Sequence, residues 1–122
     1  MVMSKPKAFS NSNAPLTPPI FYILLALASR ERHGYEIMKQ VTHDSNGTVR
    51  LGAGTLYGAI KRLLEDELIV EVDRDHARRK YYQLTDKGHT IFANELQRYS
   101  NAVELAKTRS LLGDIPLAEA AL

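Results

Sequence analysis

The chain has 122 residues, a length that allows one hydrophobic core and favours a single domain. It contains no cysteine, which excludes disulfides and thiolate metal sites and is typical of the reducing cytoplasm, and no apolar run approaches the roughly 20 residues needed to cross a bilayer. Its formal net charge of +2 comes from 16 basic and 14 acidic residues, so total charge alone does not indicate a polyanionic partner.

The chain begins with a polar segment rich in Pro, Ser and Asn that lacks the apolar centre of a secretion signal. We expect residues 1–16 to form a flexible arm. Thr17 followed by two prolines is typical of a helix start and predicts a helix over about residues 18–29. The segment IFYILLALAS within this helix is apolar nearly all round, so several of its sides must be covered, and a second copy of the chain is an economical cover.

A second helix is predicted over about residues 35–43, opened by Gly34 and followed by DSNG at residues 44–47, which ends it. Its apolar residues recur at near-helical spacing: Tyr35, Ile37, Met38 and Val41. The segment TVRL at residues 48–51 favours a short strand, and the glycines that follow allow the chain to turn into a third helix.

The third predicted helix, about residues 53–66, has two unlike faces. One face is apolar at three- and four-residue intervals and belongs to the core: Leu56, Ala59, Ile60, Leu63 and Leu64. The opposite face carries small residues, hydroxyls and cations: Gly54, Gly58 and Lys61, flanked by Thr55, Tyr57 and Arg62. Such a face can approach another surface closely, with hydrogen-bond donors at its edges.

Two segments rich in β-branched or aromatic residues, 68–72 and 80–84, predict a hairpin with a basic tip. Thr85 is expected to cap a last helix that begins near residue 86 and runs to about Leu112, with Gly113 and Pro116 ending it. Apolar residues of this helix repeat with the 4-3-4-3 spacing of a coiled coil: Phe92, Leu96, Tyr99, Val103 and Ala106.

The predicted fold is mainly α with a small β-hairpin: a winged helix-turn-helix over residues 17–86, a dimerisation helix over 87–112 and a flexible tail over 113–122. In this fold the third helix enters a DNA major groove, and the cationic wing meets phosphates or the neighbouring minor groove. We therefore expect contacts to double-stranded DNA from residues of the second helix, the third helix and the wing: Tyr35, Gly54, Thr55, Tyr57, Gly58, Lys61, Arg62, Arg78, Arg79 and Lys80.

Plainer structural interpretations of these residues stay open. The cations of the third helix and of the hairpin could be ordinary solvated charges, and the tyrosines could bury their rings and leave their hydroxyls wet. Tyr82 and Leu84 are expected in the core. The acidic run at residues 65–67 is interpreted as a solvated helix end turned away from DNA. The histidines are scattered without metal-ligand spacing, so we predict neither a metal site nor a cofactor: His33, His43, His76 and His89.

Four stretches in order and at the expected spacing resemble the PadR-like transcriptional regulators: LTPPIFYILLALAS, HGYEIMKQV, GTLYGAIKRLLEDELI and ARRKYYQLTDKG, which together cover about residues 16–88. The resemblance implies a dimeric winged-helix DNA binder, usually a repressor released by a small hydrophobic or phenolic effector. It matches GTLY at 54–57 to the start of the recognition helix, RRKYY at 78–82 to the wing, and the last helix to the dimerisation helix.

Two positions depart from the family pattern: Gly58 stands where proline is common, and Glu67 where glycine is common. With the chain ending at residue 122, it resembles the short subgroup without the larger C-terminal domain. We expect a dimer interface that joins the first and last helices: Phe21, Leu25, Phe92, Leu96, Tyr99, Val103 and Ala106. The first five of these could also line an effector pocket between subunits.

The sequence therefore predicts a cytoplasmic, homodimeric, DNA-binding transcriptional regulator, most simply a repressor that occupies a palindromic operator. A winged-helix protein-interaction module that binds no DNA is the main alternative. No nucleophile, paired acids or cofactor loop indicates an enzyme, and no aromatic platform indicates single-stranded RNA binding. We accordingly predict no catalytic residue and no membrane partner.

Overall fold

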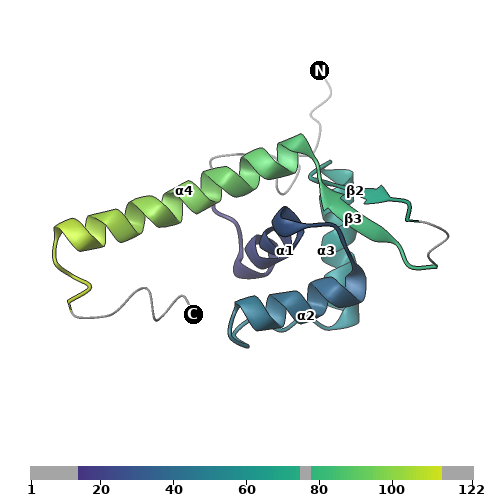
Figure 1. Ribbon diagram of the computed structural model, residues 1–122, viewed down its shortest axis with the longest axis horizontal. Helices are drawn as coiled ribbons and strands as arrows, with labels where there is room; N and C mark the ends of the chain where they lie inside the picture. The colour runs from purple at the N-terminus through teal and green to yellow at the C-terminus, as the bar shows by residue number, and fades with distance from the viewer. Residues whose placement is uncertain (1–13, 75–77, 114–122) are drawn as a thin grey trace, which may run out of the picture.

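The computed structural model describes residues 14–74 and 78–113. Within them the chain forms, in order, α1 (Pro18–Ser29), β1 (Arg32–His33), α2 (Gly34–Asp44), α3 (Ala53–Glu65), β2 (Ile69–Val72), β3 (Tyr81–Leu84) and α4 (Asp86–Thr108), as Figure 1 shows. This is the predicted mainly helical winged helix with a small sheet. Most of the expected arm and tail, Pro116 and His76 at the hairpin tip lie outside the described residues.

Helix α1 lies at the centre of the core. Thr17 directly precedes α1, as predicted. Its carbonyl accepts a backbone hydrogen bond from the Phe21 N–H at 2.9 Å. Its side chain makes no capping hydrogen bond within the described residues. Half of the helix is buried: Ile20, Phe21, Ile23, Leu24, Ala26 and Leu27. Tyr22, Leu25 and Ala28 are partly buried against the same core. A single chain thus covers most of α1, and the argument that this helix needs a second copy as cover is wrong.

The segment before α1 is packed against the start of α4. Glu95 of α4 is only 2% exposed, and its Oε2 accepts the backbone N–H of Leu16 at 2.7 Å, while its Oε1 accepts Arg98 Nη1 at 2.8 Å. The Leu16 side chain is partly buried against the core. Leu16 therefore belongs to the packed domain, although the sequence places it at the end of the arm.

Helices α2 and α3 bury most of the apolar positions that the sequence predicts, but Tyr35 of α2 is exposed. Helix α2 buries Ile37 and Val41, and α3 buries Leu56, Ile60 and Leu63. The two helices pack on each other and α2 packs on α1, which together form the helix-turn-helix. The exposed face of α3 is thereby fixed by the burial of the opposite one.

The prediction of a strand at residues 48–51 is wrong, because this segment is a loop. The Ser45 hydroxyl bonds both backbone groups of Val49, accepting its N–H at 2.9 Å and donating to its carbonyl at 3.2 Å. These local bonds satisfy the backbone without a partner strand. The sheet instead takes its third strand from β1, which pairs Arg32 with Tyr82 and His33 with Tyr81.

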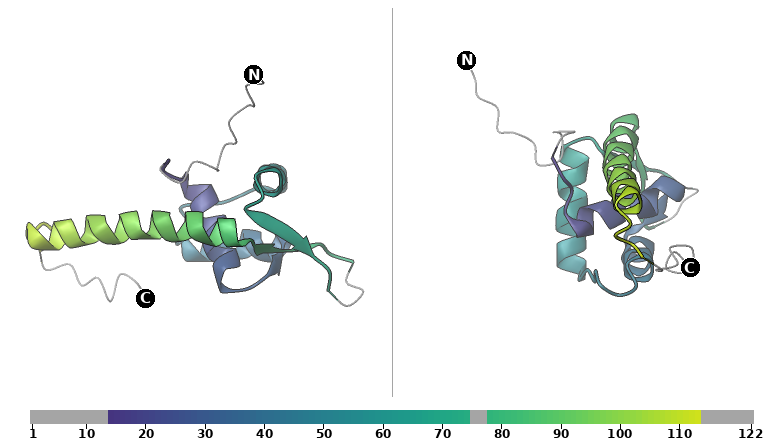
Figure 2. Two further views of the ribbon diagram at one scale, coloured as in Figure 1. Left: turned by 90° about the horizontal axis from the view of Figure 1, so that it is seen from above. Right: turned by 90° about the vertical axis from the view of Figure 1, so that its left-hand side faces the viewer.

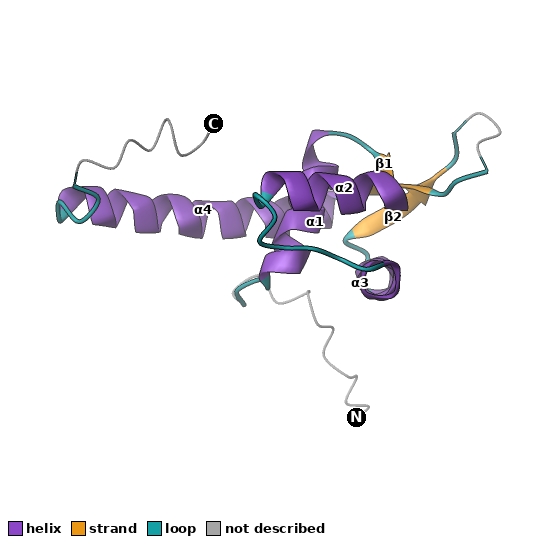
Figure 3. Ribbon diagram, turned by 90° about the horizontal axis from the view of Figure 1, so that it is seen from below, coloured by secondary structure: helices purple, strands orange, loops and turns teal. Residues whose placement is uncertain are grey.

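Strand β3 is the central strand, in the order β1-β3-β2. Its pairing with β2 is antiparallel, from Ile69 opposite Leu84 to Val72 opposite Tyr81, which is the predicted hairpin. Tyr82 and Leu84 are buried as predicted. Figure 3 shows the sheet beside the first turn of α2, with the wing extending past it.

The junction between α3, β2 and α4 is tight. The Leu68 carbonyl accepts the Thr85 N–H at 3.0 Å, and the Thr85 hydroxyl donates to the Glu67 carbonyl at 2.6 Å while accepting the Gly88 N–H at 3.0 Å. Thr85 thus caps α4 as predicted. A Cβ at Gly88 would collide with the Leu68 carbonyl oxygen. Glu67 has φ of 61°, a left-handed conformation that glycine adopts without strain, which accounts for the family's preference for glycine there.

The acidic run at residues 65–67 is not uniformly solvated, so that prediction is wrong for its central residue. Asp66 is only 5% exposed, and its carbonyl accepts Lys87 Nζ at 3.0 Å. Glu65 and Glu67 are exposed on either side of it. The run therefore forms part of the junction with α4 and is not a free helix end.

Helix α4 ends at Thr108 and does not reach the expected Leu112. Ser110 has φ of 53°, and the Leu111 N–H bonds the Ala106 carbonyl at 2.8 Å, so the chain leaves the helix before Gly113. Figures 1 and 2 show the second half of α4 extending beyond the other elements. Among the described residues, no helix is long and apolar enough to cross a membrane.

Candidate nucleic-acid interface

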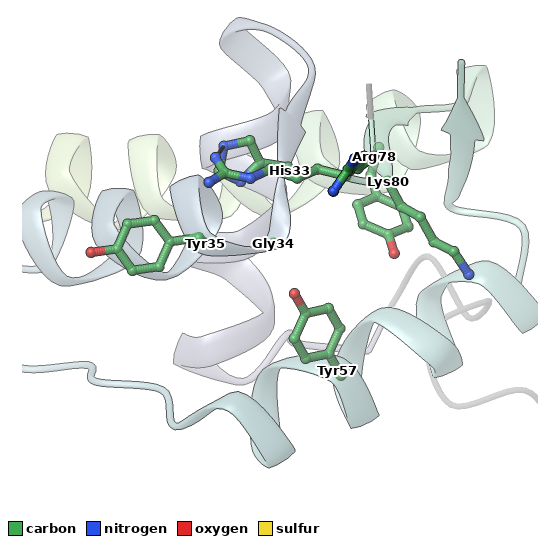
Figure 4. Close-up of a pocket in the computed structure, with 8 residues that line it drawn as sticks. His33, Gly34, Tyr35, Tyr57, Arg78 and Lys80 are labelled. Atoms are coloured by element: carbon green, nitrogen blue, oxygen red, sulfur yellow. Dashed lines mark hydrogen bonds between the residues drawn. The ribbon is translucent and has the colours of Figure 1, made fainter. Parts of the chain in front are cut away.

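A hollow of about 320 Å³ lies where the start of α2, the middle of α3 and the wing meet. Figure 4 shows the Tyr57 side chain rising from α3 toward Gly34 at the start of α2, with Arg78 and Lys80 of the wing on the other side. Eight of the described residues line the hollow: His33, Gly34, Tyr35, Tyr57, Arg78, Arg79, Lys80 and Tyr82. We call it the wing hollow.

Gly34 and Tyr57 form the contact that closes one side of the wing hollow. A Cβ at residue 34 would collide with the Tyr57 hydroxyl and would lie 2.8 Å from Cζ of the ring. Glycine therefore allows the α3 tyrosine to lie directly over the first turn of α2, while half of the tyrosine side chain stays exposed. Because the N-terminus of a helix carries partial positive charge, this contact brings a hydroxyl and a favourable dipole to one place.

The wing is held against the start of α2 by His33. The imidazole is buried, and its Nε2 lies 3.0 Å from Arg79 Nη1. Because its Nδ1 accepts the Glu36 N–H, the ring proton lies on Nε2, so the approach of Arg79 is a packing contact and not a hydrogen bond. The Tyr81 ring meets the imidazole edge-on at 5.3 Å, and the Arg74 guanidinium lies 4.6 Å from the centre of the Tyr81 ring. The edge contact of His33 with Tyr81 and the pairing of β1 with β3 fix the base of the wing relative to α2.

His33 and Glu36 also begin α2 with a reciprocal capping box. Glu36 N–H donates to His33 Nδ1 at 3.3 Å, and the His33 N–H donates to Glu36 Oε1 at 3.2 Å. Burial opposes ionisation of Glu36, but hydrogen bonds from Arg30 and from the His33 backbone outweigh it and lower the pKa of the carboxyl. Glu36 is therefore ionised at neutral pH and neutralised by Arg30, 3.0 Å away.

The charge of the wing hollow is positive. Arg78, Arg79 and Lys80 are exposed and line it, and no acidic side chain of the described residues does so. Three cations, a phenolic hydroxyl and a helix start are the groups that bind phosphate oxygens in proteins.

The remaining predicted contact residues lie on the exposed face of α3. A second hollow, of about 380 Å³, separates this face from the start of α1. Its lining includes four of the predicted residues: Gly54, Thr55, Gly58 and Arg62. At both glycines, apart from the adjacent residues and the surrounding helix backbone, no atom of the described chain lies within 4 Å of the place where a Cβ would be, so the helix is open to close approach there. Lys61, one helical turn after Tyr57, is also exposed.

Sequence reasoning did not assign three lining residues of the wing hollow to the DNA site: His33, Gly34 and Tyr82, the last of which it placed in the core. The spacing of His33 and Glu36 is the available sequence signal, since a polar residue three positions before Glu is typical of a helix start. The Gly34 contact with Tyr57 joins residues far apart in the chain, and no local pattern reveals it. Within the described residues, no group of three or more His, Cys, Asp or Glu side chains is placed to hold a metal ion.

The predicted interface and effector residues divide between the core and the surface. Phe21 and Phe92 are buried within one chain, with ring centres 5.6 Å apart, and Leu25 is partly buried. Tyr99 contacts Phe21 edge-on at 4.9 Å yet remains 43% exposed. Burial raises the pKa of Tyr99, and nearby Glu95 acts in the same direction, so the hydroxyl stays protonated at neutral pH.

The surface of α4 beyond this cluster is apolar at regular intervals. Its exposed large apolar residues are Leu96, Tyr99, Val103 and Leu105, and Ala106 is partly buried. Single exposed apolar residues are common on proteins, whereas Leu96, Tyr99 and Val103 recur at coiled-coil spacing along this projecting helix.

The family profile of the transcriptional regulator PadR-like family matches residues 23–94, which is more than half of the chain. The chain belongs to the PadR-like family. This is a family of transcriptional regulators and not of enzymes. The match spans the wing hollow and the α3 face and ends near the start of the exposed apolar row of α4.

Solved structures agree with the PadR-like assignment. The chain is 27% identical to a PadR family transcription regulator from Clostridium difficile R20291, with a TM-score of 0.62 over 75% of this chain and 97% of that one. It is 25% identical to hsRosR in the complex structure hsRosR-S1, with a TM-score of 0.63 over 87% of this chain and 93% of that one. An uncharacterized protein of Lysinibacillus sphaericus is 27% identical over 86 residues, covering 68% of this PadR-like chain and 79% of the relative.

Proposed function

We propose that this PadR-like chain binds double-stranded DNA sequence-specifically, with α3 as the recognition helix and the loop between β2 and β3 as the wing. The wing hollow carries the proposal, because three cations, the Tyr57 hydroxyl and the start of α2 converge there without an acidic side chain among the described lining residues. The proposed ligand of the hollow is a backbone phosphate, and Arg78, Arg79 and Lys80 are its main partners.

Helix α3 would read the major groove with the face that carries Gly54, Gly58 and Lys61. The open space at both glycines lets the helix backbone approach base edges and phosphates closely. Thr55 and Lys61 supply a hydroxyl and a cation for base contacts, and Arg62 supplies a cation at the other edge of the face. Tyr35 and Tyr57 would add hydroxyl contacts to the backbone.

We further propose that the chain acts as a homodimer joined through α4. The exposed row of Leu96, Tyr99 and Val103 supports this, since a second α4 would bury it with coiled-coil spacing. Such a dimer holds two α3 helices about 34 Å apart, which fits a palindromic operator with half-sites one turn apart. Phe21, Leu25 and Phe92 would lie beneath this interface, contributing the buried side of it.

Regulation in this proposal is repression in the cytoplasm, by occupation of a promoter. A small hydrophobic or aromatic effector would bind between subunits, where Phe21, Phe92 and Tyr99 gather their rings. Wedging the two α4 helices apart would change the spacing of the α3 helices and weaken operator binding.

The test is the salt dependence of duplex binding for the wild type and for Arg78→Ala/Arg79→Ala. Each lost phosphate contact should flatten the slope of log K against log salt by about 0.9, so the expected change is about 1.8 per bound chain. The matched control is Lys107→Ala/Arg109→Ala, which removes the same charge at the far end of α4. An unchanged slope in the wing variant would refute the wing assignment, and a wild type that captures a protein but no duplex would favour the interaction-module alternative.

A further inference from the structure

A third hollow lies next to the wing hollow. It has a volume of about 490 Å³ and lies between α2 and residues 50–51, just before α3. Its lining is Tyr35, Met38, Lys39, Thr42, His43, Arg50 and Leu51. Tyr35 lines both hollows, so the two are neighbours on the surface, on either side of this residue. We call this third hollow the α2 groove.

The position of the α2 groove relates it to the proposed recognition helix. Figure 3 shows that the loop after α2 runs back along α2 and leads to the start of α3. Leu51 of the groove is followed directly by Gly52, the residue that precedes the first turn of α3. In Figure 4 the Tyr35 side chain points away from Tyr57 and the wing, so it marks the side of the surface on which the groove continues.

The groove is cationic, with an apolar floor. Lys39 and Arg50 are exposed, and His43 is exposed at its rim. No acidic side chain of the described residues lines the groove. Asp44 follows His43 in sequence. Its Oδ1 accepts a hydrogen bond from Gln40 Nε2 at 2.8 Å and lies 3.4 Å from His43 Nδ1.

Both strong cations are held in place. Lys39 Nζ lies 5.4 Å from the centre of the Tyr35 ring, one helical turn away, which is within range of a cation–π interaction. Arg50 Nε donates to the Gly47 carbonyl at 3.3 Å, which directs the guanidinium against the turn after α2. Exposed cations restrained in this way lose less conformational entropy when they bind an anion.

We propose that the α2 groove binds the DNA sugar–phosphate backbone next to the phosphate held in the wing hollow, through Lys39 and Arg50. This inference rests on the proposed function, because it assigns a further stretch of the same strand to the same protein surface. It follows from the shared residue Tyr35, the position of the groove beside the start of α3, and the charge of its lining. The footprint of each chain then extends past α3 on the side opposite the wing.

The test uses Lys39→Gln/Arg50→Gln with a fluorescein-labelled random-sequence duplex of about 30 base pairs, titrated between about 50 and 200 mM KCl, because counterion release is independent of sequence. The slope of log K against log KCl should flatten by about 1.8 per bound chain relative to the wild type. Lys107→Gln/Arg109→Gln is the matched control and should bind with the wild-type slope. Since both groove cations are exposed, the thermal midpoint of the groove variant should stay close to that of the wild type.

The outcomes separate the two proposals. If the groove variant keeps the wild-type slope while Arg78→Ala/Arg79→Ala flattens it, the groove inference is wrong and the proposed function stands. If the slope of log K against log KCl flattens as much for the control variant as for the groove variant, the effect comes from net charge. The groove inference is then also wrong. If the wild type binds no duplex at the lowest salt, both proposals fail together.

Discussion

Substitution of Gly88 by alanine tests the junction that fixes α4 relative to α3. The new Cβ would collide with the Leu68 carbonyl oxygen and would lie 3.0 Å from the Leu68 carbonyl carbon. Because these are backbone atoms, the first turn of α4 must move away from β2. That movement stretches the bond from the Thr85 N–H to Leu68, now 3.0 Å, and the bond from the Thr85 hydroxyl to Glu67, now 2.6 Å.

The expected loss of stability follows from these contacts. Overpacking costs about 1–3 kcal/mol, and each weakened hydrogen bond about 0.5–1.5 kcal/mol. Alanine in place of glycine within a helix returns about 0.5–1 kcal/mol. The net loss is therefore about 2–4 kcal/mol, which lowers the midpoint of thermal unfolding by roughly 10–25 °C for a domain of about 100 residues.

Urea unfolding followed by circular dichroism measures this loss. Gly58→Ala is the matched control, because it is also a helical glycine but has open space at the Cβ position. That variant should gain about 0.5–1 kcal/mol. A Gly88→Ala protein within about 0.5 kcal/mol of the wild type would show that the junction is not rigid, and the reasoning from the collision would be wrong.

Three other predictions concern the start of α2 and the exposed apolar residues of α4. His33→Ala should destabilise the fold by about 1 kcal/mol in urea unfolding, and His33→Asn by less, because asparagine can still cap α2. Leu96→Glu/Val103→Glu should convert the proposed α4 dimer to a monomer in sedimentation experiments while each chain stays folded. A variant that sediments as the wild type does would contradict the proposed α4 interface. Against the opposing effect of burial, hydrogen bonds from Arg30 and the His33 backbone hold the pKa of Glu36 below its ordinary value. Its stabilisation is therefore fully present above that ordinary value and is lost as pH falls through the lower folded-state pKa. Glu36→Gln should therefore reduce the acid dependence of stability, and an unchanged dependence would refute this.

Local patterns explain why the helices and the hairpin could be predicted from the sequence. Apolar spacing and start residues are properties of neighbouring residues, and they located α1, α2, α3 and the start of α4. Strand β1 could not be found this way, because a strand of two residues is too short to show an alternating pattern. The false strand at 48–51 has suitable strand residues, but the Ser45 side chain satisfies Val49 locally and the free edge of β3 pairs with Arg32 and His33.

Part of the site could be predicted, because the charge and the size of each residue can be read directly from the sequence. The cations of the wing and the small residues of α3 are visible in the sequence, and the structure gathers five of the ten expected DNA contacts in one hollow. The contact of Gly34 with Tyr57 and that of His33 with Arg79 depend on tertiary packing, so no spacing rule reveals them. The end of α4 was also missed, because Ser110 takes a left-handed conformation that its residue type does not predict.

Hydrogen–deuterium exchange of the full chain, with and without a saturating DNA duplex, tests the central claim most directly, because it reports which backbone segments the duplex covers. The account predicts slower exchange on DNA binding in the first turn of α2, the exposed first half of α3 and the wing residues 78–80, and unchanged exchange around the acidic turn at 65–67. Protection confined to α4 or to the acidic turn, with the wing unaffected, would contradict it.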